Sequence, residues 1–111
     1  MQEIELKDKN FSNYVELVFD IIGGKWKILI VWDLREREKR FRELQKSVGK
    51  ITDKMLTQQL RELEEAELIS RKAYPEVPPR VEYSLTLLGK SILPVIEMLE
   101  EWGKQYHSVF K

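Results

Sequence analysis

The sequence of 111 residues lacks cysteine altogether and has a single histidine, His107. A chain without a thiol forms no disulfide, no cysteine-ligated zinc site and no thiolate nucleophile. One histidine among scattered carboxylates also gives little support to a metal site or to a Ser-His-Asp triad. We therefore expect no enzymatic activity, no metal and no cofactor.

Long apolar segments are absent too. The longest apolar run, residues 28–32, is far too short to span a bilayer, and the polar residues 1–12 do not resemble a signal peptide. We therefore expect a cytoplasmic chain that does not bind a membrane. Its length suits a single domain, residues 1–111, and its content of 42% hydrophobic and 34% charged residues is typical of a folded chain.

The chain also lacks a net charge: its 19 basic residues balance its 19 acidic ones. The charges are unevenly distributed, however. Residues 35–54 carry eight basic and four acidic side chains, whereas residues 1–20 carry two lysines and five acids. A basic middle between acidic ends suits a chain that presents its middle to phosphate groups. Alternating charge that merely solvates a turn gives the same pattern, so charge alone does not decide.

Helical periodicity is the main feature that is present. Apolar residues recur three and four positions apart in several segments before residue 67, which predicts helices with one apolar face. Ser12 and Thr52 are placed to cap the first and fourth helices, while Gly23-Gly24 and Gly49 are placed to end the first and third. The predicted helices cover residues 12–22, 25–34, 41–47 and 52–66, with residues 35–40 as a charged connection.

The periodicity changes after residue 68. Residues 69–74 and 80–85 both resemble strands, and the second alternates apolar and polar side chains as a half-buried strand does. The proline-rich residues 75–79 cannot continue a ladder, so they predict the tip of a hairpin. Thr86 then caps a last helix over residues 87–110, which Pro94 is expected to kink or break.

Two short helices joined by a tight turn and followed by a β-hairpin form a winged helix-turn-helix. The predicted fold class is therefore mainly α with a small β-hairpin wing (α+β). Residues 41–66 are expected to form the helix-turn-helix and residues 69–86 the wing. Because the second helix of this motif lies in the major groove, the order of elements predicts a sequence-specific regulator that binds double-stranded DNA.

The expected DNA-reading side chains lie on the helix of residues 52–66. If Leu56, Leu60 and Leu63 face the core, the opposite side carries residue types that pair with base edges or phosphates. These candidates are Asp53, Lys54, Thr57, Gln58 and Arg61. The alternative is an ordinary solvated face. Acidic residues follow from residue 62 onward and would repel phosphates, so only the first half of the helix is expected to enter the groove.

Other residues near the motif are candidates for contacts to the DNA backbone or from the wing. They are Arg40, Lys50, Thr52, Arg71 and Arg80. Arg80 stands beside two prolines at the hairpin tip, and a stiff turn that presents an arginine suits minor-groove or phosphate contact. The alternative for Arg80 is an ion pair with Glu76 or Glu82.

Several motifs occur together and in order. They are GGKWKILIVWDL, RF-x-EL, KMLTQQLRELE, PEVPPRVEYSLT and a late EEWG. With them the chain resembles the HxlR-type regulators, bacterial and archaeal transcription factors related to the MarR type, over about residues 13–104. The resemblance implies a dimeric winged helix-turn-helix repressor or activator that binds palindromic operators. It also implies dimerisation through the first helix, residues 12–22, and the last, residues 87–110.

One position departs from the family pattern. Several members sense electrophiles or oxidants through a cysteine in a Cys-Pro pair shortly before the first helix, and here those positions are Asn13 and Tyr14. Because the chain has no cysteine, that sensing mechanism cannot operate. The resemblance therefore implies DNA binding and dimerisation without thiol-redox regulation, and it does not identify the signal.

The last helix supports dimerisation independently of the resemblance. Its apolar stripe is longer than one small core can cover, and Trp and Tyr are enriched at interfaces. With two residues of the first helix added, the expected homodimer interface consists of Val15, Phe19, Leu99, Trp102, Tyr106 and Phe110. The alternative is a last helix that folds back on its own chain.

Two other functions stay open. A winged helix can bind a protein instead of DNA, and zero net charge would suit such an interaction module. The regulator can also sense a small apolar effector, for which Tyr14, Phe19, Trp26 and Trp32 are candidates to form an aromatic pocket. The alternative for these four residues is ordinary core packing.

Overall fold

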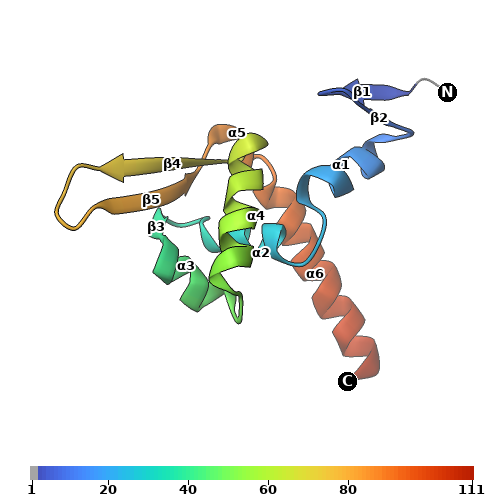
Figure 1. Cartoon of the computed structure of the whole chain (residues 1–111). Helices are drawn as coiled ribbons and strands as arrows, with labels where there is room; N and C mark the ends of the chain where they lie inside the picture. The colour runs from blue at the N-terminus through green and yellow to red at the C-terminus, as the bar shows by residue number, and fades with distance from the viewer. Residues whose placement is uncertain (1–2) are drawn as a thin grey trace.

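The computed structural model describes residues 3–111, and Figure 1 shows how its helices and strands are arranged. The helices are α1 (Tyr14–Ile22), α2 (Trp26–Asp33), α3 (Phe41–Val48), α4 (Asp53–Glu65), α5 (Leu87–Lys90) and α6 (Leu93–Phe110). The strands are β1 (Ile4–Leu6), β2 (Lys9–Phe11), β3 (Lys39–Arg40), β4 (Ile69–Tyr74) and β5 (Arg80–Leu85). The helix pair α3–α4 followed by the β4–β5 hairpin is a winged helix-turn-helix, so the predicted α+β fold class is confirmed.

Side-chain caps explain where the helices begin. The prediction that Thr52 caps α4 is confirmed, because its hydroxyl accepts a hydrogen bond from a backbone N–H in the first turn. The prediction for α1 is wrong by one residue, since the cap is Asn13 and not Ser12. The Asn13 Oδ1 accepts from the N–H of Glu16 at 2.8 Å, and the Glu16 carboxylate in turn accepts from the N–H of Ser12. Serine and asparagine are both good capping residues, and the two hydrogen bonds with Glu16 favour Asn13 as the cap.

Glycines turn the chain between helices. Gly24, after α1, has a φ of +88°, and Gly49, after α3, has a φ of +127°. Side chains rarely adopt such angles, whereas glycine adopts them without steric strain. The predicted ends of α1 and α3 at these glycines are therefore confirmed.

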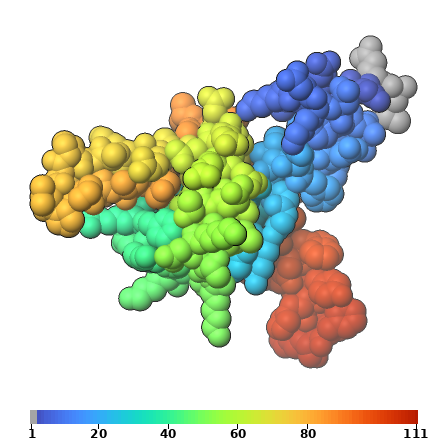
Figure 2. All heavy atoms as spheres, viewed as in Figure 1, coloured from blue at the N-terminus to red at the C-terminus, as the bar shows by residue number. Residues whose placement is uncertain are grey.

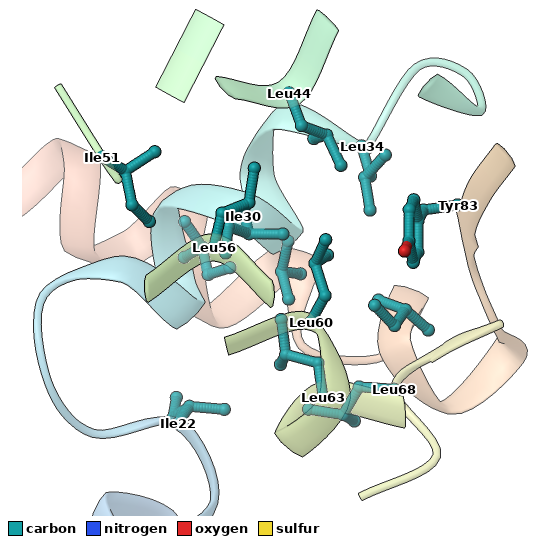
Figure 3. Packing of buried hydrophobic residues seen from close by; sticks show 13 residues of the cluster. Ile22, Ile30, Leu34, Leu44, Ile51, Leu56, Leu60, Leu63, Leu68 and Tyr83 are labelled. Atoms are coloured by element: carbon teal, nitrogen blue, oxygen red, sulfur yellow. The ribbon is translucent and has the colours of Figure 1, made fainter. Parts of the chain in front are cut away.

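The core lies between α2, α3 and α4, and Figure 3 shows its side chains pointing toward one another. Leu56, Leu60 and Leu63 of α4 are fully buried, as the spacing predicts. They pack with Ile30 of α2 and Leu44 of α3, which are equally buried. Because one stripe of α4 is completely covered, the opposite side of this helix must face outward.

The wing has the strand bounds that the sequence predicts, and its antiparallel register places Tyr74 opposite Arg80. A third strand, β3, pairs with β5 so that Lys39 lies opposite Tyr83. It falls within residues 35–40, for which the sequence predicts only a charged connection. The strand was not predicted because two residues are too few to show a periodicity. β3 thereby joins the start of α3 to the middle of β5.

The last helix, predicted over residues 87–110 with a kink or break at Pro94, is divided into two helices. Thr86 caps a helix as expected, but this helix is the short α5. The expected break is confirmed. Pro94 lies in the first turn of α6, where the missing N–H would have no partner within the helix. A Cβ on Gly89 would overlap the carbonyl oxygen of Leu68, so glycine lets α5 pack directly on that backbone.

The two ends of the chain extend away from the core (Figures 1 and 2). At one end, β1 and β2 form a hairpin that the sequence did not predict, since three-residue strands carry little pattern. At the other end, most of α6 projects beyond the remaining helices. No helix among residues 3–111 is long and apolar enough to cross a bilayer.

Candidate nucleic-acid interface

The outer face of α4 runs down the middle of the surface shown in Figure 2, with the wing projecting to one side. Lys54, Thr57, Gln58 and Arg61 are all exposed on this helix, away from its buried leucines. Within the described part of the chain, the ion pairs of α4 are made by Asp53 and Glu62. Lys54 and Arg61 therefore keep their charges available for an anionic partner.

Asp53, at the start of α4, is tied to α3. Two guanidinium nitrogens of Arg42 donate to its two carboxylate oxygens at 2.8 and 3.1 Å, and Gln45 Nε2 donates to Oδ1 at 2.6 Å. The hydrogen bonds from Arg42 and then from Gln45 hold the pKa of Asp53 below its usual range. The ionised carboxylate thus connects the two helices of the motif across their turn.

The residues expected to contact the DNA backbone lie around the starts of α3 and α4. Lys50 and Thr52 stand in the turn between these helices, and Arg40 immediately precedes α3; all three are exposed. The Arg40 backbone N–H donates to Glu43 Oε1 at 2.9 Å, which anchors the first turn of α3. Lys50 and Thr52 therefore lie directly before α4, whereas Arg40 lies at the other end of α3, opposite Glu82 of β5.

On the wing, Arg80 has partners within its own hairpin. Its guanidinium carbon lies 3.9 Å from the ring centroid of Tyr74. Its Nε lies 2.9 Å from Glu76 Oε2, without good hydrogen-bond alignment, and 3.9 Å from Glu82 Oε2. Both ion pairs that are the alternative for Arg80, with Glu76 and with Glu82, are therefore present. Arg71, on β4, is exposed.

Two ion pairs with largely covered lysines join separate elements, and the sequence patterns did not predict them. Lys27 of α2 is buried, and its Nζ donates to Glu62 Oε1 at 2.6 Å. Lys39 Nζ lies 3.1 Å from Asp33 Oδ1, with both side chains largely covered. A charged residue inside an apolar helix was the available signal for Lys27. Its partner could not be predicted, since the acid lies 35 positions further along the chain.

A second surface consists of apolar side chains that the chain leaves uncovered on α1 and α6. The exposed residues include Val15, Phe19, Leu99, Trp102, Tyr106 and Phe110. Along α6 the aromatic rings follow one another, with centroid distances of 5.3 Å and then 5.0 Å. The start of α6 packs on the chain's own core, where Ile96 is buried, but all residues from 97 to 111 are exposed, so most of this helix does not fold back on its own chain.

An apolar cavity of about 300 Å³ lies where α1, α5 and α6 meet the end of α4. Its lining includes Val18, Ile22, Leu68, Ile92 and Val95. It includes none of the four aromatic residues expected to form an effector pocket. Two of those, on α1, are exposed, and the two tryptophans of α2 pack against the core.

The chain is similar in sequence to known proteins. A family model described as HxlR-like helix-turn-helix matches residues 21–110. An HTH-type transcriptional regulator of Methanothermobacter thermautotrophicus is 49% identical over 104 residues, which cover 94% of this chain and 79% of that protein. The matched residues include both the helix-turn-helix and the wing.

Solved structures agree with these relatives. The HTH-type transcriptional regulator ytcD has a TM-score of 0.83 and 45% identity, covering 86% of this chain and 98% of that one. The redox regulator HypR in its reduced form has a TM-score of 0.83 and 42% identity, covering 88% and 97%. Both the relatives and the fold are those of transcription regulators rather than enzymes. The chain belongs to the HxlR-like helix-turn-helix family and is a transcriptional regulator with a MarR-like, DNA-binding winged helix fold.

Proposed function

We propose that the chain is a homodimeric regulator that binds a palindromic operator in double-stranded DNA and acts without a thiol switch. The outer face of α4 is the observation that supports this most strongly. It combines two cations without ion-pair partners among the described residues, Lys54 and Arg61, with the hydrogen-bonding side chains of Thr57 and Gln58. Such a combination suits a helix in the major groove.

Each side chain on this face has its own part in the proposal. Arg61 pairs with the O6 and N7 of guanine, Gln58 pairs with adenine, and Thr57 meets a thymine methyl group or a phosphate. Lys54, near the helix start, contacts a phosphate. Asp53 acts indirectly, because its hydrogen bonds to α3 fix the angle at which α4 enters the groove.

Residues around α4 supply contacts that do not depend on base sequence. They are Lys50 and Thr52 directly before α4, Arg40 directly before α3, and Arg71 and Arg80 on the wing. For Arg80, a phosphate replaces Glu76 as the ion-pair partner when DNA binds. This exchange is reasonable because surface ion pairs contribute only about 0–1 kcal/mol.

A second copy of the chain is the proposed partner of the uncovered apolar surface. Phe19 is 69% exposed and Trp102 is 62% exposed. Apolar patches of this kind on soluble proteins mark interaction sites. Two-fold pairing through α1 and α6 would place the two α4 helices about one DNA turn, roughly 34 Å, apart.

The proposed regulator receives a signal other than thiol oxidation. HypR is described as a redox regulator, whereas this sequence has no cysteine that could form a sulfenic acid or a disulfide. The apolar cavity beside α1 and α6 has a size that suits a small apolar effector. Since α1 and α6 are the proposed dimer helices, a molecule bound there would alter the spacing of the two α4 helices.

A titration of the purified chain against DNA from immediately upstream of its own gene tests this function. The measurement is made at two salt concentrations with random-sequence competitor present. We expect tight binding that resists the competitor and weakens as salt rises, because phosphate contacts release counterions. Binding no tighter than to random DNA, followed by failure to select any genomic fragment, would instead favour the protein-interaction module.

A further inference from the structure

Lys27 is an unusual residue for its position in the fold. It lies on α2, among apolar neighbours, and is only 8% exposed. A buried ammonium group is unfavourable unless it is paired and hydrogen-bonded. The Lys27 Nζ meets this requirement by donating to Glu62 Oε1 at 2.6 Å. The buried lysine therefore holds one carboxylate of the DNA-facing helix in place.

Glu62 has a second partner on the exposed face of α4. Gln58 Nε2, one helical turn earlier, donates to Glu62 Oε2 at 2.6 Å. The hydrogen bonds from Lys27 and then from Gln58 lower the pKa of Glu62, so its carboxylate stays ionised and can only accept hydrogen bonds. It must therefore face the NH₂ of Gln58 and not the carbonyl oxygen.

The orientation of the Gln58 amide follows from these two contacts. One amide hydrogen is used by Glu62, while the second hydrogen and Oε1 receive no partner from residues 3–111. An amide held this way offers one donor and one acceptor in a fixed order. That order matches the N7 acceptor and N6 donor of adenine in the major groove.

We propose that the Lys27–Glu62 pair is a positioning device that fixes the Gln58 amide and thereby sets the base that Gln58 selects. The inference rests on the proposed DNA-binding function, and neither Lys27 nor Glu62 needs to touch DNA. An amide free to rotate would offer its donor and acceptor in either order and discriminate less between bases.

The test is a selection of DNA from a random pool by the full chain and its variants. Glu62→Gln keeps the size of the side chain but offers both a donor and an acceptor, so it no longer dictates the Gln58 orientation. Glu65→Gln is the matched control, because it removes the same charge from the exposed side of α4. We expect Glu62→Gln to lower the base preference at one position of each half-site about fivefold or more, and Glu65→Gln to leave the profile unchanged.

Two further variants complete the experiment. Gln58→Ala identifies the position that Gln58 reads. Because Glu62→Gln leaves Lys27 without its carboxylate, the double variant Lys27→Met/Glu62→Gln removes the buried charge as well, with folding checked by circular dichroism. Unchanged preference at that position in both Glu62 variants would overturn the inference, as would a Gln58→Ala profile identical to wild type. Failure of the wild-type chain to enrich any sequence would contradict the proposed function itself.

Discussion

The helices α4 and α6 are both amphipathic, but the apolar side of α4 is buried whereas most of the apolar side of α6 is exposed. In α4 the stripe of Leu56, Leu60 and Leu63 is completely covered by other parts of the same chain. In α6 only Ile96 is buried, while Trp102 and Tyr106 stay largely exposed. The apolar side of α4 is therefore packed within one chain, whereas most of the apolar side of α6 is left open to the second copy that we propose.

Their outward faces differ as well. The outer side of α4 carries polar and cationic side chains such as Gln58 and Arg61, which water solvates readily. The outer side of α6 carries aromatic rings, and covering such surface contributes about 25 cal/mol for each Å² removed from water. This difference is consistent with the proposal that α4 binds a polar, anionic partner and α6 an apolar one.

The largest effect is expected when the same substitution is made in the two helices. Leu60→Ala leaves a cavity in the core and is expected to lower the free energy of unfolding by about 2–5 kcal/mol. Leu99→Ala removes a half-exposed side chain. It is expected to change the free energy of unfolding of the isolated chain by only about 0.5 kcal/mol. Urea denaturation at low protein concentration measures both free energies of unfolding. Equal decreases in the two variants would contradict the difference in burial between α4 and α6.

The next effect concerns the partner of α6. Trp102→Glu places a charge at the start of the aromatic row and is expected to give monomers in size-exclusion chromatography with light scattering. Operator affinity is expected to fall about a hundredfold, because two linked half-site contacts become one. Ser108→Glu adds the same charge on the opposite side of α6 and serves as the control. A Trp102→Glu variant that stays dimeric would place the interface elsewhere.

A smaller effect is expected on the outer face of α4. Arg61→Ala is expected to weaken operator binding by about 1–3 kcal/mol and to relax the preference at one base pair, since a bidentate contact to guanine is lost. The oligomeric state is expected to stay unchanged. Lys104→Ala, which removes a positive charge from α6 instead, is the control in the same binding assay. If both variants lose equal affinity, α4 has no special role in reading bases.

On the wing, the effect is expected to be uniform rather than specific. Arg80→Ala is expected to lower affinity for every DNA sequence to a similar degree. The slope of log affinity against log salt is expected to become shallower by about one, because one phosphate contact disappears. Binding measured over a series of salt concentrations gives this slope. An unchanged slope would mean that Arg80 keeps Glu76 as its partner in the complex.

The smallest effect concerns pH. The hydrogen bond from Lys27 is the main reason that the pKa of Glu62 lies below its usual range. Such a carboxylate stabilises the fold above its unfolded pKa of about 4.3, and this contribution is lost as the pH falls through the lower folded value. Glu62→Gln is therefore expected to flatten the acid side of the stability profile, measured by denaturation between neutral and acidic pH. Glu97→Gln, on exposed α6, is expected to leave the profile unchanged.

What the sequence could predict depended on how local each feature is. The Thr52 cap, the bounds of both wing strands and the inward leucines of α4 follow from patterns within a few residues. The strands β1, β2 and β3 were missed because two or three residues show no period. Their positions are set by pairing with other strands or by turns.

The candidate site shows the same division. The sequence selected exposed residues of α4 correctly as surface residues, since their spacing from the buried leucines determines their side of the helix. It could not show that Asp53 is held by Arg42 or that Glu62 is held by Lys27, because these pairs join different helices. Contacts across helices depend on tertiary geometry, and a single sequence does not contain it explicitly.

The stoichiometry of the operator complex tests the central claim most directly. Sedimentation of the chain on its selected DNA measures how many copies bind each duplex, and the selected sequence shows whether the site is symmetric. We predict two chains on one duplex, with two inverted half-sites whose centres lie about 10 base pairs apart. One chain on an asymmetric site, or no enriched sequence at all, would contradict the account.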